Sequence, residues 1–129
     1  MCLSSLDENF SPEPEAEGIG WKIFDKEDNG SLLFPIKRHE GSWSARANRW
    51  LTSPSGQING WNYTDRPFRY PKGFHLYPTR KVAAEIRFCE GLNFTVRRIK
   101  WRGLLASGEQ DGFPVIVVRQ IRILPKKRR

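Results

Sequence analysis

Apolar residues recur at every second position in the first ordered stretch of the chain, which is the pattern of a strand with one buried face. Ile19, Trp21 and Ile23 form this run, and a second apolar run covers residues 31–36. The segment between them, residues 25–30, ends in Asn-Gly, a pair that favours the tight turn of a hairpin. The pattern predicts an antiparallel hairpin, with order beginning near Ile19.

The next segments carry weaker patterns. Residues 40–51 could form a short helix, but their aromatic and aliphatic side chains fit helical spacing only modestly. Residues 52–60 are rich in Ser, Pro, Gly and Asn and are predicted to form a loop.

A helix over about residues 79–88 is the main helical prediction. Thr79 can cap its first turn, because a threonine hydroxyl accepts a hydrogen bond from an unpaired first-turn N–H group. Val82, Ala83 and Ile86 would then face the core.

The segment that follows, residues 94–101, alternates as a strand but changes phase. Phe94 and Val96 fall on one side and Ile99 and Trp101 on the other. We expect a β-bulge at the intervening pair of arginines, residues 97 and 98, which would restore one buried face and leave both arginines accessible.

The last apolar run, residues 115–118, is continuous and indicates a central strand covered on both faces. Together the patterns predict an α+β fold, with a twisted, mainly antiparallel sheet and one principal helix. We expect a flexible acidic arm over 1–18, a single α+β domain over 19–125 and a basic tail over 126–129.

Length and composition narrow the class of protein. The chain has 129 residues, enough for one domain but not for a large multi-domain enzyme. No apolar run is long enough to span a membrane, and the start lacks the pattern of a signal peptide, so we expect a cytoplasmic protein without membrane contact. The two cysteines are interpreted as free thiols.

The formal net charge of +8 hides a strong asymmetry. Residues 1–30 hold eight acids and two bases, whereas the remaining 99 residues hold 20 bases and six acids, a net charge of +14. A body this basic attracts phosphates and other polyanions at long range. The alternative is that the charge serves only solubility.

Candidate chemistry is sparse. The possible metal ligands, Cys2, His39, His75 and Cys89, show no metal-site spacing, and paired carboxylates are scarce in the basic body. We therefore expect no catalytic residues, no metal and no cofactor.

Two groups of residues are candidates for binding an anion. In the stretch 61–72, aromatic residues that could stack on bases lie between basic residues, although such aromatics between prolines also cap cores. His75 could donate to a ligand near Arg80 and Lys81 at the start of the helix, or could simply bond a backbone carbonyl. The candidate ligand-binding residues are Trp61, Arg66, Arg69, Tyr70, Lys72, His75, Arg80, Arg97 and Arg98.

The C-terminal half resembles a small module found in phages and mobile elements. The matching features are Gly73-Phe-His75, Thr79 with Ala83 and Ala84, Val96–Gly103 and Val115–Leu124. The resemblance covers about half of the chain, and it implies a viral accessory protein more than a reaction.

Residues 73–84 are also similar in outline to the ADP-ribosyltransferase fold, in which a glycine-led strand precedes a helix. That fold carries a catalytic acid on a late strand, whereas residues 113–118 contain none. The nearest acids are Glu109 and Asp111 in the preceding turn. This likeness implies a binding derivative rather than an active enzyme.

The leading hypothesis is a non-catalytic binding protein of a phage or mobile element that antagonises a host defence system. Its target would be anionic: a nucleotide, a nucleic acid or an acidic face of a host protein complex. The alternatives are a nucleic-acid-binding protein and a degenerate ADP-ribosyltransferase-like enzyme.

Overall fold

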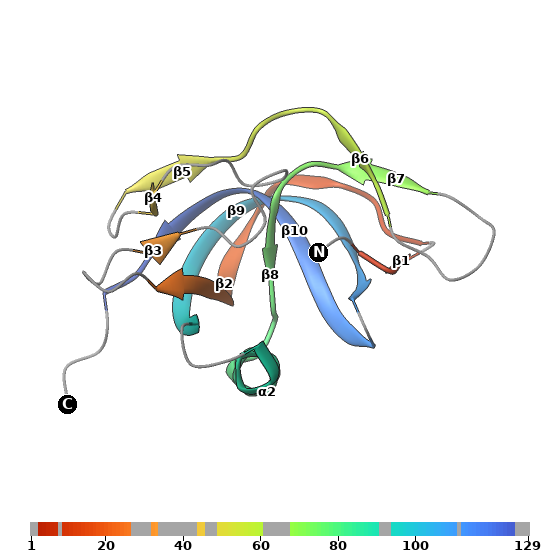
Figure 1. Ribbon diagram of the computed structural model, residues 1–129. Helices are drawn as coiled ribbons and strands as arrows, with labels where there is room; N and C mark the ends of the chain where they lie inside the picture. Colours follow the sequence, from red (N-terminus) through yellow and green to blue (C-terminus); the bar gives the residue numbers. More distant parts are fainter. Residues whose placement is uncertain are drawn as a thin grey trace.

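The computed structural model describes residues 3–7, 9–26, 32–33, 44–45, 49–60, 68–90, 94–110 and 112–125, with the backbone alone for residues 26, 33, 44–45 and 87–90. Figure 1 shows the elements in chain order: β1 (Ser5–Leu6), β2 (Glu13–Lys26), β3 (Leu32–Leu33), β4 (Ser44–Ala45), β5 (Trp50–Thr52), β6 (Gln57–Asn59), β7 (Arg69–Pro71), β8 (Phe74–Leu76), α2 (Arg80–Glu90), β9 (Phe94–Gln110) and β10 (Phe113–Ile123). The predicted α+β class is confirmed, with strands dominating the described part of the chain.

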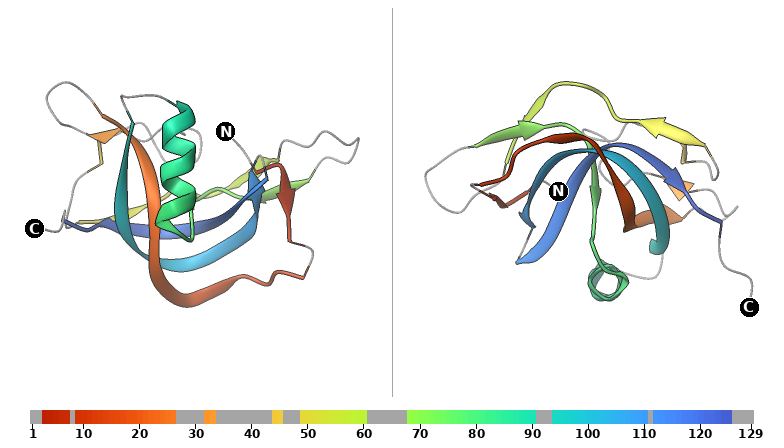
Figure 2. Two further views of the ribbon diagram at one scale, coloured as in Figure 1. Left: turned by 90° about the horizontal axis from the view of Figure 1, so that it is seen from below. Right: turned by 180° about the vertical axis from the view of Figure 1, so that it is seen from behind.

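Two long antiparallel strands, β9 and β10, form the centre of the main sheet. β2 pairs along the free edge of β9 and is extended by β3 and then β4, while β1 pairs with the far end of β9. β5 and β8 pair with successive parts of β10. The central strands arch across the molecule, with α2 on the concave side (Figures 1 and 2). Every pairing in the described sheet is antiparallel, as the alternation predicted.

β8 connects β10 on one side of the sheet with β2 on the other. One of its edges pairs with β10, where Leu76 is opposite Ile116 and Phe74 is opposite Val118. Tyr77, directly after β8, forms a bridge to Trp21 of β2 through two backbone hydrogen bonds of 2.9 and 2.7 Å. The strands β2, β9, β10 and β8 therefore close into a ring.

The ring separates two apolar clusters. Phe74 and Leu76 point from β8 into cluster 1, whereas Tyr77 joins cluster 2. The buried members of cluster 1 are Phe24, Leu32, Leu51, Phe74, Leu76, Ile99, Trp101, Val118, Ile121 and Ile123, and those of cluster 2 are Leu3, Ile23, Tyr70, Tyr77, Ala83, Ala106, Val115 and Val117. Residues of β10 alternate between the clusters, which confirms the expected central strand covered on both faces.

The helix forms where the sequence predicted it. α2 spans Arg80–Glu90, and the backbone N–H of Val82 donates to the Thr79 hydroxyl oxygen at 3.3 Å, which confirms the cap. Ala83 is fully buried in cluster 2, and Val82 and Ile86 pack against that cluster. The helix thereby covers the part of β2 and β9 nearest their shared end.

The chain is ordered well before Ile19, where we expected a flexible arm over 1–18. β1 pairs with β9, and β2 already begins at Glu13. Leu3 is fully buried in cluster 2. The composition does not show this because two apolar residues, Leu3 and Leu6, suffice to anchor a short strand at the edge of β9. The predicted hairpin partners, β2 and β3, are paired antiparallel, while the Asn-Gly turn and the tail 126–129 lie outside the described residues.

The expected β-bulge at Arg97 and Arg98 is wrong. Both residues pair in uninterrupted register with β2. The phase changes because β9 contributes to both clusters: Phe94 and Val96 pack on cluster 2, while the later apolar positions face cluster 1. The register between β9 and β10 shifts instead at Leu105, beside Gly103, whose φ of 78° favours glycine.

The short helix considered for residues 40–51 is not formed in the part that the structure describes. Residues 44–45 form β4, and Trp50–Thr52 form β5 on the edge of β10. Long-range pairing has overridden a weak helical spacing. The predicted loop 52–60 contains the short strand β6, which pairs with β7 in a separate two-stranded sheet.

The described part of the chain contains no helix long and apolar enough to cross a membrane.

Replacing Thr79 by alanine tests the cap. The variant should lose about 1 kcal/mol of unfolding free energy, because the Val82 N–H loses its acceptor. Urea denaturation measures the loss, and Thr79→Ser, which keeps the hydroxyl, should recover most of it. Equal losses in both variants would contradict the assignment.

Replacing Gly108 by alanine tests the docking of β1. The added methyl group would overlap the carbonyl oxygen of Ser5, so β1 must move away. We expect a loss of about 1–3 kcal/mol of unfolding free energy and faster amide exchange in β1. Gly20→Ala is the control, because its methyl group meets no atom closer than 3.4 Å.

Candidate functional site

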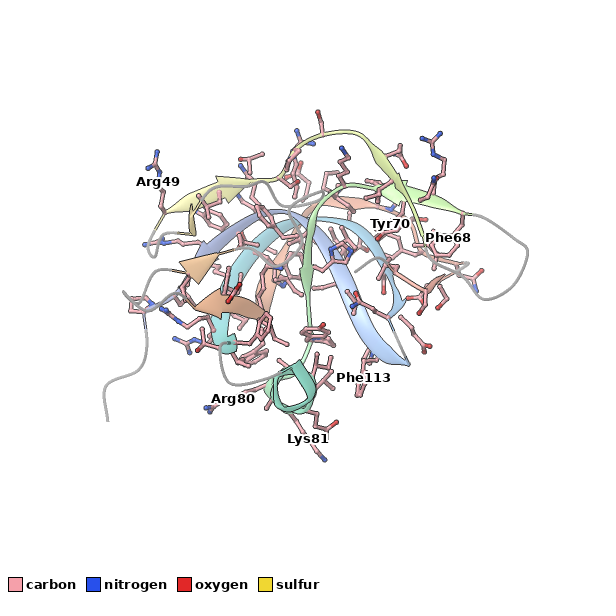
Figure 3. The ribbon with its side chains drawn as sticks, viewed as in Figure 1. Arg49, Phe68, Tyr70, Arg80, Lys81 and Phe113 are labelled. Carbon is pink, nitrogen blue, oxygen red and sulfur yellow. The ribbon has the colours of Figure 1, made fainter. Side chains whose placement is uncertain are left out.

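The structure disperses the residues of the aromatic-basic stretch. Trp61 and Arg66 lie outside the described residues. Arg69 is exposed on β7, and Lys72 is half-buried, with its backbone N–H bonded to the carbonyl of Gly56 at 2.9 Å. Figure 3 shows Arg80 projecting from α2, on the opposite side of the molecule from Phe68 and Tyr70. The described members of this stretch therefore do not form one site with the start of the helix.

Tyr70 and His75 contact each other inside cluster 2. The Tyr70 hydroxyl accepts a hydrogen bond from the Leu3 N–H at 2.9 Å and lies 3.2 Å from His75 Nε2. The rings meet edge to face, and both side chains are buried, Tyr70 with 1% and His75 with 4% of its surface exposed. The role we expected for Tyr70, stacking on a ligand base, does not fit this position. The pair instead holds the N-terminal segment against the core.

The two neighbouring arginines of β9 point to opposite faces of the sheet, as successive residues of a strand do. Arg97 shares its face with Lys22 and is half-buried, and one of its guanidinium nitrogens donates to the carbonyl of Leu124 at 2.9 Å. Burial lowers the pKa of Arg97 below its ordinary value. Arg98 lies on the other face, opposite Trp21. Only Arg98 therefore shares a face with the exposed cations of β9.

That face gathers basic side chains from two strands. Arg98, Lys100 and Arg102 alternate along β9 with residues buried in cluster 1, so they point away from it, and Lys100 and Arg102 are exposed. Arg122 of β10 is opposite Lys100 on the same side. We call these four residues the basic sheet face.

Cross-strand register places Lys100, Arg122 and Arg102 of the basic sheet face in two rows that run across β2, β9, β10 and β5, while Arg98 is opposite Trp21 in the next row. One row consists of Ile19, Lys100, Arg122 and Trp50, and the adjacent row consists of Glu17, Arg102, Gln120 and Thr52. Ile19 is 46% exposed, which is unusual for a large apolar residue in this molecule. The rows thus combine cations with exposed apolar and aromatic surface.

Arg102 is held in a defined orientation. Its guanidinium carbon lies 4.0 Å from the centre of the Trp50 ring, a cation–π contact. Its Nε donates to the side-chain oxygen of Gln120, and the Gln120 amide donates to the Thr52 hydroxyl at 2.9 Å. Three strands therefore fix the plane of one exposed guanidinium group.

The arrangement carries an electrostatic cost. Lys100 and Arg122 are direct cross-strand partners, and like charges opposite each other destabilise a sheet. Among the described residues, Arg122 Nε is buried and has no hydrogen-bond partner. Glu17 is opposite Arg102, but the row that holds Lys100 and Arg122 contains no acid, so this pair of cations is suited to receive an anion from outside.

Sequence reasoning missed Lys100, Arg102, Arg122 and Trp50. A signal was present for the first two, since cations at every second position of a strand share a face. Trp50 was missed because its segment has no clear strand pattern and because its neighbours come from distant parts of the chain.

The expected strand and helix around Gly73–Ala84 are present as β8 and α2. Glu109 is exposed near the end of β9, opposite Pro114, and Asp111 lies outside the described residues. Comparisons with protein-family models, with curated proteins and with solved structures find no match to this chain. The resemblances stated above therefore stay predictions.

Replacing Tyr70 by phenylalanine tests the buried contact with the N-terminal segment. We expect a loss of about 1–3 kcal/mol of unfolding free energy, because the buried Leu3 N–H loses its acceptor. Denaturant unfolding measures it. Ser107→Ala is the control: it removes a hydroxyl that bonds the same segment, at Asp7, but at an exposed position, so its loss should stay within about 0.5 kcal/mol. Equal losses of unfolding free energy in the two variants would contradict the role of Tyr70 in holding the N-terminal segment.

Proposed function

We propose that this protein is a non-catalytic binding protein that holds nucleic acid on its basic sheet face. The observation that carries the proposal is the register that places Arg98, Lys100, Arg102 and Arg122 on one face of two adjacent strands. Nucleic-acid affinity depends chiefly on cations placed against phosphates.

The dimensions of the face suit an extended polyanion. Alternate residues of a strand lie about 6.6 Å apart, so the three cations of β9 span about 13 Å. Arg122 adds a second column about 4.8 Å away on β10. A row of cations can follow successive phosphates of a chain.

Solubility alone explains the face less well. A solubilising surface intersperses charges of both signs, whereas Lys100 is directly opposite another cation. An acidic protein face is a second anionic partner, but Trp50 beside the cations favours a ligand with flat aromatic groups. The setting in a phage or mobile element, the antagonism of a host defence system and the absence of catalysis stay predictions.

Removing one charge should affect affinity and stability in different directions. Lys100→Gln should weaken binding of a single-stranded oligonucleotide and reduce the slope of log K against log salt by about 0.7, the value for one phosphate contact. Its unfolding free energy at low salt should stay equal or rise slightly, because the repulsion with Arg122 is removed. Fluorescence titration at several salt concentrations and urea denaturation measure the two quantities.

Lys81→Gln is the matched control, because Lys81 is an exposed lysine of α2 that points away from the sheet (Figure 3). It should leave both the affinity and the salt slope close to those of the parent protein. Salt-independent binding, or equal effects of the two variants, would argue against the proposed face.

A further inference from the structure

Arg102 and Trp50 form a stacked pair whose geometry defines the ligand more closely. The guanidinium carbon lies over the Trp50 ring, 4.0 Å from its centre. Arg102 is nevertheless exposed as a residue, and it stands among the outward-pointing cations of β9. A planar cation in this position can take a second flat group on the side away from the indole.

The orientation of the guanidinium plane is set before any ligand arrives. Gln120 accepts from Arg102 Nε and is itself held by Thr52. A side chain that is already fixed loses little conformational entropy when a ligand stacks on it. The hydrogen bonds therefore prepare Arg102 for stacking rather than only for attracting charge.

We infer that this stacked pair is a platform for an unpaired nucleobase, and that the ligand is a single-stranded nucleic acid. The inference rests on the proposed function. Bases in a duplex are already stacked on each other, so only an unpaired base presents its face to Arg102. Lys100 and Arg122, in the adjacent row, are placed to hold the phosphates beside that base.

The test separates stacking from charge by using three probes of equal length: a thymidine oligonucleotide of about ten residues, the same backbone without bases, and a duplex. The protein should bind the thymidine strand about fivefold or more tightly than the abasic strand, and more tightly than the duplex. Arg102→Lys keeps the charge but removes the planar group. It should bring the ratio between the first two probes close to one, while binding of the abasic strand stays nearly unchanged.

Arg119→Lys, at an exposed arginine of β10 that alternates with Gln120 and Arg122 and so points to the other face, is the matched control and should leave the ratio as in the parent protein. Equal affinity for the thymidine and abasic strands, a preference for the duplex, or a ratio that survives Arg102→Lys would each overturn the platform. The first two results would leave nucleic-acid binding by charge in place. Binding of none of the probes would overturn the proposed function as well.

Discussion

The ring closed by β8 is the constraint on which the rest of the structure depends. A short strand can connect two sheet edges only if both of its faces are buried, and Phe74 to Tyr77 satisfy this condition. The closure also buries Lys22, whose ammonium group donates to the carbonyl of His75 at 3.0 Å and lies 5.9 Å from the centre of the Phe24 ring. A buried cation is tolerated only with such contacts. The closure thereby separates the two clusters and sets where α2 starts.

This division determines which surface is available for binding. α2 and the N-terminal segment cover cluster 2 at both ends of β9, where Phe94 and Ala106 lie. Between these ends, the side of β9 that points away from cluster 1 carries Arg98, Lys100 and Arg102. Cluster 1 stabilises the strands from one face, so the fold tolerates the repulsion between Lys100 and Arg122 on the other face. The buried apolar contacts and the surface proposed for binding thus lie on opposite faces of the same strands.

The sequence predicted elements that depend on local signals and failed where distant segments decide. The hydroxyl of Thr79 accepts from the N–H of Val82, only three residues along the chain, so the local sequence was sufficient to predict the start of α2. The phase change in β9 was interpreted as a bulge because one sequence does not reveal that a strand serves two clusters. Trp50 became part of the candidate site only through its pairing with Arg122, over 70 residues away along the chain. His75 and Tyr70 carried the right chemistry for a ligand, but their burial could not be read from composition.

The fold places part of the acidic N-terminal segment beside the basic remainder of the chain. β2 runs antiparallel to β9, so Glu17 becomes the direct partner of Arg102, while Ile19 is the partner of Lys100. Glu17 therefore borders the basic sheet face on the β2 side, and Trp50 borders it on the β5 side. A polyanion is repelled along the first border and finds a stacking surface along the second. If the proposed function is right, the polarity of the sequence would orient the ligand across the sheet, which the net charge alone does not do.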